Sequence, residues 1–180
     1  MWSYSSGTSN PLARVLRDLF DGDLGGLVRF ARERHFDPVG MTSAFFEPDA
    51  SGSFIGSSFA IATARDWARF GELYLRDGVW GGRRVLPPGW VSYVTTPTPE
   101  APDRRYGAHW WLNAGDAGDP ARAPWPALPR DAYAARGHSG QRVVVVPSAE
   151  LAVVRLGLGQ QDVEEDGTQE LVADLLGALL

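Results

Sequence analysis

The last third of the sequence holds the pattern that most restricts the fold. Three runs rich in valine, alanine and other β-prone residues follow one another, at residues 132–136, 142–146 and 151–158. They are joined by two short segments, 137–141 and 147–150, that carry glycine, proline and small polar residues. Short connections of this composition favour antiparallel neighbours. The unbroken apolar run 143–146 is typical of a strand covered on both faces. The sequence therefore predicts an antiparallel meander.

A helix is predicted to cover this meander. Apolar residues recur at helical spacing near the end of the chain, at Leu171, Val172, Leu175, Leu176 and Leu179. Thr168 is the expected cap, and Glu170 lies favourably near the positive end of the helix dipole.

The rest of the chain shows helical patterns separated by breakers. Ser9 and Asn10 before Pro11 predict a helix over about 11–20, since proline fits the first helical position. A second helix is expected over about 24–34, ended by Pro38. A third begins with a capping-box-like pair, Thr63 and Asp66, and runs towards Gly78. A brief helical segment follows Pro88 and stops before Pro97.

Four further segments are predicted as turns, strands or loops. Residues 36–58 are interpreted as irregular with one short strand, and 79–86 as a tight turn with extended flanks. Residues 106–112 are rich in aromatic side chains and predict a strand. Residues 114–130 are expected to form a surface loop.

Composition excludes several classes of function. A hydrophobic share of 44% suits a folded core, and a net charge of −5 gives no attraction to phosphate backbones or anionic lipid. We therefore expect neither a nucleic acid nor a membrane as partner. Cysteine is absent, which excludes disulfides, cysteine nucleophiles and thiolate metal sites. Every basic residue is an arginine, so no side chain of this sequence supplies an amine. No apolar run is long enough to span a membrane and no secretion signal is recognised at Met1, and the cellular compartment stays open.

The three histidines do not indicate a metal site. His35, His109 and His138 are widely separated and show none of the usual ligand spacings. His35 is interpreted as a helix-end residue and His109 as a strand residue. No metal and no cofactor are expected.

Two short polar clusters are the candidates for chemistry. His138, Ser139, Gly140 and Gln141 lie between two predicted strands, beside Gly137, where small residues allow a ligand carbonyl to approach the backbone. Residues 4–7 lie before the first predicted helix. Taken singly, each cluster favours a structural interpretation, as a polar turn and as a packing tyrosine.

Considered in chain order, the two clusters and the segments between them resemble the serine hydrolases of the beta-lactamase and penicillin-binding-protein superfamily. The likeness is greatest to the branch that holds class C beta-lactamases, esterases and aminohexanoate-oligomer hydrolases. The segments that carry it are WSYSSGTSN at 2–10, DPVGMTS at 37–43, FEPDASG at 46–52, GSSFAIATARDWARFG at 56–71 and RGHSGQ at 136–141.

The resemblance implies a role for each cluster. Enzymes of this superfamily use a Ser-x-x-Lys nucleophile, a tyrosine element and a Lys-Thr-Gly or His-x-Gly strand element. The resemblance implies that Tyr4 transfers protons and that Ser6 takes the place of an asparagine. His138, Ser139 and Gly140 correspond to the strand element, and the Gln141 backbone N–H to one oxyanion donor. With His138 in the place of lysine, any positive charge there depends on pH, and the preference shifts modestly from beta-lactamase towards esterase or amidase.

The sequence departs from the family at the nucleophile, because a Ser-x-x-Lys cannot occur without lysine. We therefore interpret residues 1–180 as the C-terminal part of one such domain, with the remainder of a helical region over about 1–105 and sheet strands with a terminal helix over about 106–180. The expected fold class is α+β, an antiparallel meander packed by a C-terminal helix plus part of a helical region, an incomplete beta-lactamase/transpeptidase-like fold. Such a piece leaves a sheet edge uncovered, which invites association with the missing half or a second chain.

Two functions stay open at this point. The first is a serine hydrolase acting on a small-molecule amide, ester or lactam through an acyl-enzyme, inactive in isolation because the nucleophile and lysine are missing. The alternative is a non-catalytic binding or assembly module that keeps the old cleft. Family members are often periplasmic or secreted and some are cytoplasmic.

Overall fold

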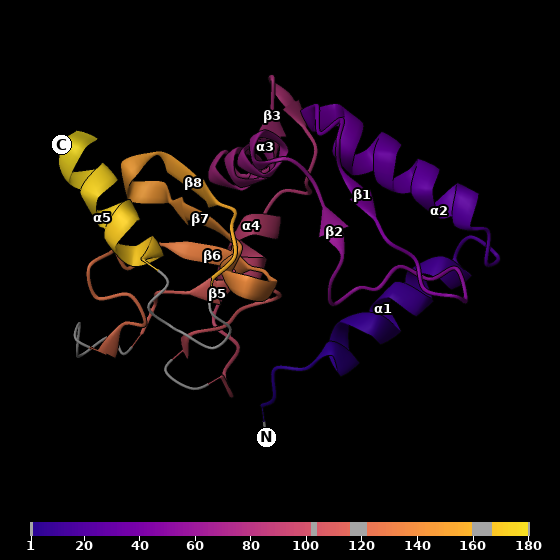
Figure 1. Ribbon diagram of the computed structural model, residues 1–180, viewed down its shortest axis with the longest axis horizontal. Helices are drawn as coiled ribbons and strands as arrows, with labels where there is room; N and C mark the ends of the chain where they lie inside the picture. The colour runs from indigo at the N-terminus through magenta and orange to yellow at the C-terminus, as the bar shows by residue number, and fades with distance from the viewer. Residues whose placement is uncertain (1, 102–103, 116–121, 160–166, 180) are drawn as a thin grey trace. The chain divides into compact units, whose positions relative to one another are not determined.

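The computed structural model describes residues 2–101, 104–115, 122–159 and 167–179. By its internal contacts the chain forms two compact units. One comprises residues 3–69, and the other comprises residues 70–180 together with residues 1–2. Each unit is described by itself (Figure 1). The interpretation of the whole chain as part of one domain stays a prediction.

An antiparallel sheet forms the centre of the larger unit. Its strands are β5 (Trp111–Leu112), β6 (Tyr133–Arg136), β7 (Arg142–Val146) and β8 (Leu151–Arg155), in that spatial order. Tyr133 lies opposite Val145 and Arg136 opposite Arg142, which fixes the register of the first hairpin. The predicted meander is confirmed, although β8 ends at Arg155 rather than Leu158.

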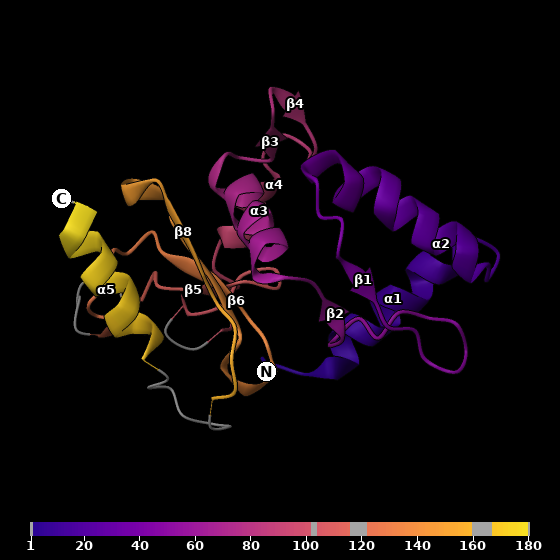
Figure 2. The same cartoon turned by 45° about the horizontal axis from the view of Figure 1, so that its top comes forward.

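Strand β7 is buried along its whole length, as the run of four valines predicted. Val144 and Val146 pack into a core with Val172 and Leu176 of helix α5 (Thr168–Leu179). Figures 1 and 2 both show α5 running beside this end of the sheet. Because side chains alternate across a strand, Val143 and Val145 face the other way.

The second face of β7 meets helix α3 (Ala64–Leu75) at a glycine. A Cβ atom built on Gly71 would lie 3.0 Å from Val143 Cγ1 and 3.3 Å from the Ala152 Cβ. The missing side chain therefore lets the helix backbone approach the sheet closely. Both faces of β7 are thus covered, one by α5 and one by α3.

The aromatic segment before β5 is not the continuous strand that its composition predicted. Only Trp111 and Leu112 pair with β6, because His109 adopts a positive φ of 65° and turns the chain. A single bridge joins Tyr106 to Trp111 across that turn. The aromatic residues of 106–112 are typical of a strand, but composition does not indicate the turn at His109.

The segment after β5 was predicted as a surface loop, but several of its residues are buried and hydrogen-bonded. Leu128 and Ala123 are buried, and Asn113 is completely inaccessible to solvent. The Asn113 side chain accepts a hydrogen bond from Trp125 N–H at 2.7 Å and contacts the carbonyl oxygens of Trp125, Leu128 and Pro129 at 3.0–3.1 Å. Part of the predicted loop, 116–121, lies outside the described residues.

The smaller unit begins with α1 (Ser6–Asp18), which starts earlier than predicted. Ser5 is the cap, and its Oγ accepts a hydrogen bond from Gly7 N–H at 3.0 Å. Pro11 consequently lies inside the helix rather than at its first position. The prediction placed the start at the proline because an internal proline removes one helical hydrogen bond, a loss that this helix tolerates.

Helix α2 (Leu24–Ala31) is capped by Asp23, whose carboxylate accepts hydrogen bonds from Gly25 and Gly26 N–H at 2.9 Å. It continues into a π-helical turn over Arg32–Phe36. Ala13 of α1, Leu27 of α2 and Phe54 form the core of this unit.

The predicted capping box at the start of α3 is only half formed. Thr63 Oγ1 accepts a hydrogen bond from Asp66 N–H at 3.3 Å. The Asp66 carboxylate does not reach back, and instead accepts hydrogen bonds from Ser43 N–H at 2.8 Å and Ser43 O–H at 2.6 Å. Arg69 donates to the other carboxylate oxygen at 2.6 Å. The short aspartate side chain therefore ties α3 to the loop at Ser43.

The remaining elements are small. β1 (Phe45–Phe46) pairs with β2 (Ala60–Ile61), β3 (Val79–Trp80) pairs with β4 (Arg83–Arg84), and α4 is Trp90–Thr95. The predicted turn over 79–86 and the brief helix before Pro97 are both confirmed.

Candidate active site

The predicted strand element forms a tight turn between β6 and β7. His138, Ser139 and Gly140 make one turn of 3-10 helix, in which Ser139 has φ 55° and Gly140 has φ 83°. A non-glycine residue in the left-handed region is unfavourable and is held there by its surroundings. At Gly137, an added Cβ would lie 2.9 Å from the Gln141 Cβ, so this position also requires a small residue.

Hydrogen bonds hold the carbonyl groups of this turn. Ser139 C=O accepts from Gly159 N–H at 2.8 Å, and Gln141 C=O accepts from Gly137 N–H at 2.8 Å. Arg155 of β8 donates to the Gly140 carbonyl at 2.8 Å. The carbonyls are therefore fixed by groups on both flanking segments, and the orientation of the peptide planes is fixed with them.

The Gln141 side chain makes two further hydrogen bonds that stabilise the turn. Its Nε2 donates to the Gly157 carbonyl at 2.7 Å, and its Oε1 accepts from Gly157 N–H at 2.9 Å. This pair of bonds joins the start of β7 to the segment just beyond β8. The resemblance assigned a role to the Gln141 backbone only, and no sequence pattern indicated this contact of its side chain.

The Gln141 backbone N–H is the predicted oxyanion donor. It points towards His138 C=O at 3.5 Å, the long limit of a hydrogen bond, where the interaction is weak. A stronger acceptor would compete successfully for this N–H. A donor that is held in place before the reaction needs little reorganisation when negative charge develops.

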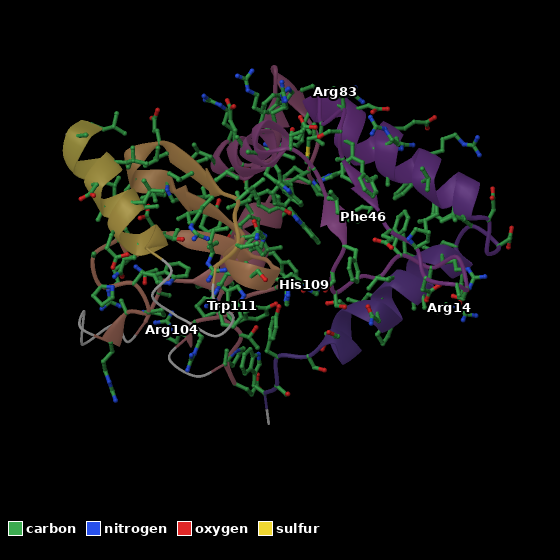
Figure 3. All side chains as sticks on the ribbon, in the orientation of Figure 1. Arg14, Phe46, Arg83, Arg104, His109 and Trp111 are labelled. Carbon is green, nitrogen blue, oxygen red and sulfur yellow. The ribbon has the colours of Figure 1, made fainter. Side chains whose placement is uncertain are left out.

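Aromatic side chains surround the strand that leads into the turn. The Arg136 guanidinium lies 4.8 Å from the ring centre of Trp111, a cation–π contact on the last residue of β6. Trp111 packs edge-on against Tyr106 at 5.1 Å, and Tyr106 contacts Trp2 at 5.6 Å. Trp111 is labelled in Figure 3. No sequence pattern connects these residues, because the contacts join three separate parts of the chain.

Tyr4 and Ser6, the other predicted site residues, belong to the smaller unit. Tyr4 precedes α1, outside any helix or strand, and is 58% exposed. Ser6 was expected in a loop and is instead the first residue of α1. His138–Gln141 belong to the larger unit, so the joining of the two clusters into one site stays a prediction.

The other two histidines lie apart from the turn. His35 is in the π-helical turn, with its ring 5.6 Å from the ring of Phe36, and burial lowers the pKa of its imidazole. His109, labelled in Figure 3, is exposed at the positive-φ turn rather than in the predicted strand. Over the described residues, no three potential ligands among His, Asp and Glu are grouped as a metal would require.

A helix that spans a membrane has to be both long and apolar. In the part of the chain that the structure describes, no helix is long and apolar enough to cross a bilayer.

Comparison with known families identifies the chain at this point. The family model for beta-lactamase matches residues 1–177. This chain belongs to the beta-lactamase family. The match includes both the tyrosine segment and the turn at 138–141. No curated protein sequence matches the chain.

Solved structures show that the beta-lactamase-like fold is shared. A Bacillus anthracis protein provisionally named a 6-aminohexanoate-dimer hydrolase superposes with a TM-score of 0.72 at 21% identity, covering 99% of this chain and 44% of its own. A Mycobacterium bovis beta-lactamase gives 0.68 at 18% identity, covering 98% and 63%. A Bacteroides dorei protein provisionally named a beta-lactamase gives 0.56 at 16% identity, covering 84% and 52%. The chain thus spans about half the length of these structures, with the mixed helical and antiparallel architecture that was predicted.

Proposed function

We propose that this chain carries the proton-transfer and oxyanion elements of a serine hydrolase that cleaves a small amide, ester or lactam through an acyl-enzyme. The observation that supports it most is the turn at 138–141, in which the carbonyls of Ser139, Gly140 and Gln141 are engaged while the Gln141 N–H makes only a weak contact. A fixed peptide N–H of this kind is suited to stabilising a tetrahedral oxyanion.

The proposed chemistry assigns one step to each element. A serine hydroxyl attacks the substrate carbonyl carbon, its proton passes to a base, and the carbonyl π electrons move onto oxygen. Gln141 N–H donates to that oxyanion. Collapse of the intermediate expels the leaving group, which takes a proton relayed through the Tyr4 hydroxyl, and water then hydrolyses the acyl-enzyme by the same sequence. Ser6 and His138 line the proton path in this proposal, and Ser139 and Gly140 shape the backbone beside the substrate.

The nucleophile is the part that this chain does not supply in the proposal. A Ser-x-x-Lys needs lysine, and the 180 residues contain none. We place the nucleophile in a further polypeptide segment and expect the 180 residues alone to show no covalent catalysis, because an oxyanion donor without a nucleophile gives only residual acceleration.

A fluorophosphonate probe tests the first half of this proposal. The folded 180-residue chain is expected not to be labelled. Stoichiometric labelling of a serine in this chain would overturn the assignment of the nucleophile to another segment.

Complementation tests the second half. The chain is mixed with a separately expressed N-terminal half that contains Ser-x-x-Lys, and turnover of p-nitrophenyl esters and nitrocefin is measured. Restored turnover that Tyr4→Phe and His138→Ala each reduce supports the hydrolase. Saturable binding of the segment and of an ester analogue without turnover supports the alternative, a binding module.

A further inference from the structure

The larger unit contains a pocket of about 410 Å³ away from the turn at 138–141. Its walls come from α3, α4, β5 and the start of β6, and the lining includes Tyr74, Thr95, Asp131, Tyr133 and Pro147. Tyr133 and Pro147 lie at the end of the β6–β7 hairpin that is remote from the turn. Tyr133 and Arg136 are three residue steps apart along β6, about 10 Å at the usual rise. The pocket is therefore separate from the proposed oxyanion site.

Tyr133, one of the lining residues, carries a buried polar atom without a hydrogen-bond partner among the described residues. Tyr133 is 4% exposed, and among the described residues nothing lies within hydrogen-bond distance of its buried hydroxyl. The ring itself is well packed, edge-on against Trp110 at 5.0 Å. Buried hydroxyls in native proteins nearly always have a partner, so an orphaned one beside a pocket points to a group that the pocket receives.

Charged side chains also line the pocket. Asp131 and Asp77 are both exposed there, and Asp77 is paired with Arg84 at 3.4 Å. Burial raises the pKa of the Tyr133 phenol, and the negative charges of Asp131 and Asp77 raise it further. The Asp131 carboxylate on the same wall favours a hydrogen-bond donor that carries a positive charge.

Among the described lining residues Arg130 carries a positive charge, and one of its N–H groups is engaged by a backbone carbonyl. Arg130 directs Nη1 to the Ala114 carbonyl at 2.5 Å. The Asp131 carboxylate accepts from Ser148 N–H at 2.6 Å and Ser148 O–H at 2.9 Å, which leaves lone pairs on both oxygens for a further donor. The second phenol, Tyr74, accepts from Trp90 Nε1–H at 3.4 Å and is also one of the lining residues. Apolar residues such as Val91 and Leu112 complete the lining.

We infer that this pocket binds a primary alkylammonium group, with the ammonium between the Asp131 carboxylate and the Tyr133 hydroxyl oxygen and the alkyl chain against the apolar wall. The volume accommodates a small ligand of this kind. Because the Tyr133 oxygen is shielded from solvent, the ammonium reaches it only after neighbouring lining side chains shift, and the amides of α4 are expected to respond to binding.

Titration of the ¹⁵N-labelled 180-residue chain with n-butylammonium chloride, followed by NMR, tests this inference. Saturable amide shifts are expected at Thr95, Leu112 and Ala132. Tyr133→Phe and Asp131→Asn are each expected to weaken binding by about tenfold, since each removes a hydrogen bond to a charged group. Tyr93→Phe, which removes a phenol hydroxyl outside the lining, is the matched control and is expected to bind as the unchanged chain does.

Tyr133→Phe deletes a hydroxyl with no partner, so its unfolding temperature without ligand is expected to equal or exceed that of the unchanged chain. This variant keeps the test valid if Asp131→Asn fails to fold. Equal affinity in Tyr133→Phe, absence of saturable shifts, or stronger shifts with sodium n-butyrate at the same amides would each overturn the inference.

Discussion

The hydrogen bonds between the Gln141 side chain and Gly157 are expected to stabilise the turn at 138–141 locally. Gln141→Met keeps the length of the side chain but removes both hydrogen bonds to Gly157, which measure 2.7 and 2.9 Å. Gln141→Glu keeps an acceptor for Gly157 N–H and loses only the donor to the Gly157 carbonyl. The two variants therefore separate the contributions of the two bonds.

The magnitude follows from the geometry and exposure of these bonds. Both are neutral and solvent-exposed, so each contributes at the lower end of the usual range, about 0.7 kcal/mol. The contact of Nε2 with Ser139 C=O at 3.4 Å is too long to add much. Together the two bonds stabilise the closed turn by about 1.4 kcal/mol, which is about a tenfold change in the local opening equilibrium.

Native-state hydrogen exchange measures that equilibrium directly. The Gly157 amide is expected to exchange about tenfold faster in Gln141→Met, and Gly159, whose N–H binds Ser139 C=O, is expected to follow in the same direction. In Gln141→Glu the Gly157 amide is expected to keep most of its protection. Amides of β7 serve as the internal control, since a local opening leaves the buried strand unchanged.

The opposite pattern would refute this reasoning. If the Gly157 amide in Gln141→Met exchanges at the unchanged rate while the fold is intact, the side chain does not fasten the turn. The preorganisation of the Gln141 N–H would then need another source.

Three further substitutions test the packing on which the site depends. Asn113→Ala is expected to lower the free energy of unfolding by about 3 kcal/mol in urea denaturation, because two amide hydrogens and one accepted bond are lost and buried carbonyls remain; a loss below about 1 kcal/mol would contradict this role. Gly71→Val is expected to cost about 2 kcal/mol by overpacking against Val143, whereas Gly177→Val, at an open helix position, is expected to cost less. For Asp66, burial alone would raise the pKa, but hydrogen bonds from Ser43 and Arg69 outweigh it and hold the pKa below its ordinary value of 3.8. The ionised Asp66 side chain therefore contributes to the free energy of unfolding above pH 3.8, and this contribution is lost as the pH falls through the lower folded-state pKa. Asp66→Asn is expected to be less stable at neutral pH and to lack this loss of stability in an acid titration followed by circular dichroism. An acid profile identical to that of the unchanged chain would exclude the linkage.

Local pattern determined the regular elements of this protein. The valine run of β7 required two covered faces, and both are present, one against α5 and one against Gly71 of α3. The glycines at 137 and 140 marked a tight turn, and the order of motifs indicated the beta-lactamase family. These features depend on neighbours along the chain and on alternation across a strand, which a sequence displays directly.

Only the tertiary structure showed which contacts hold those elements together. Pro11 predicted a helix start, but the Ser5 cap moved the start to Ser6. Asp66 was expected to close a capping box, but it binds Ser43, which lies far away in the sequence. Gln141 with Gly157, Trp111 with Arg136 and Asn113 with the loop after β5 are all contacts between separate segments. The sequence names both partners of each pair, but only the folded backbone brings them together, to 2.7–3.0 Å for the hydrogen bonds and 4.8 Å for the cation–π contact.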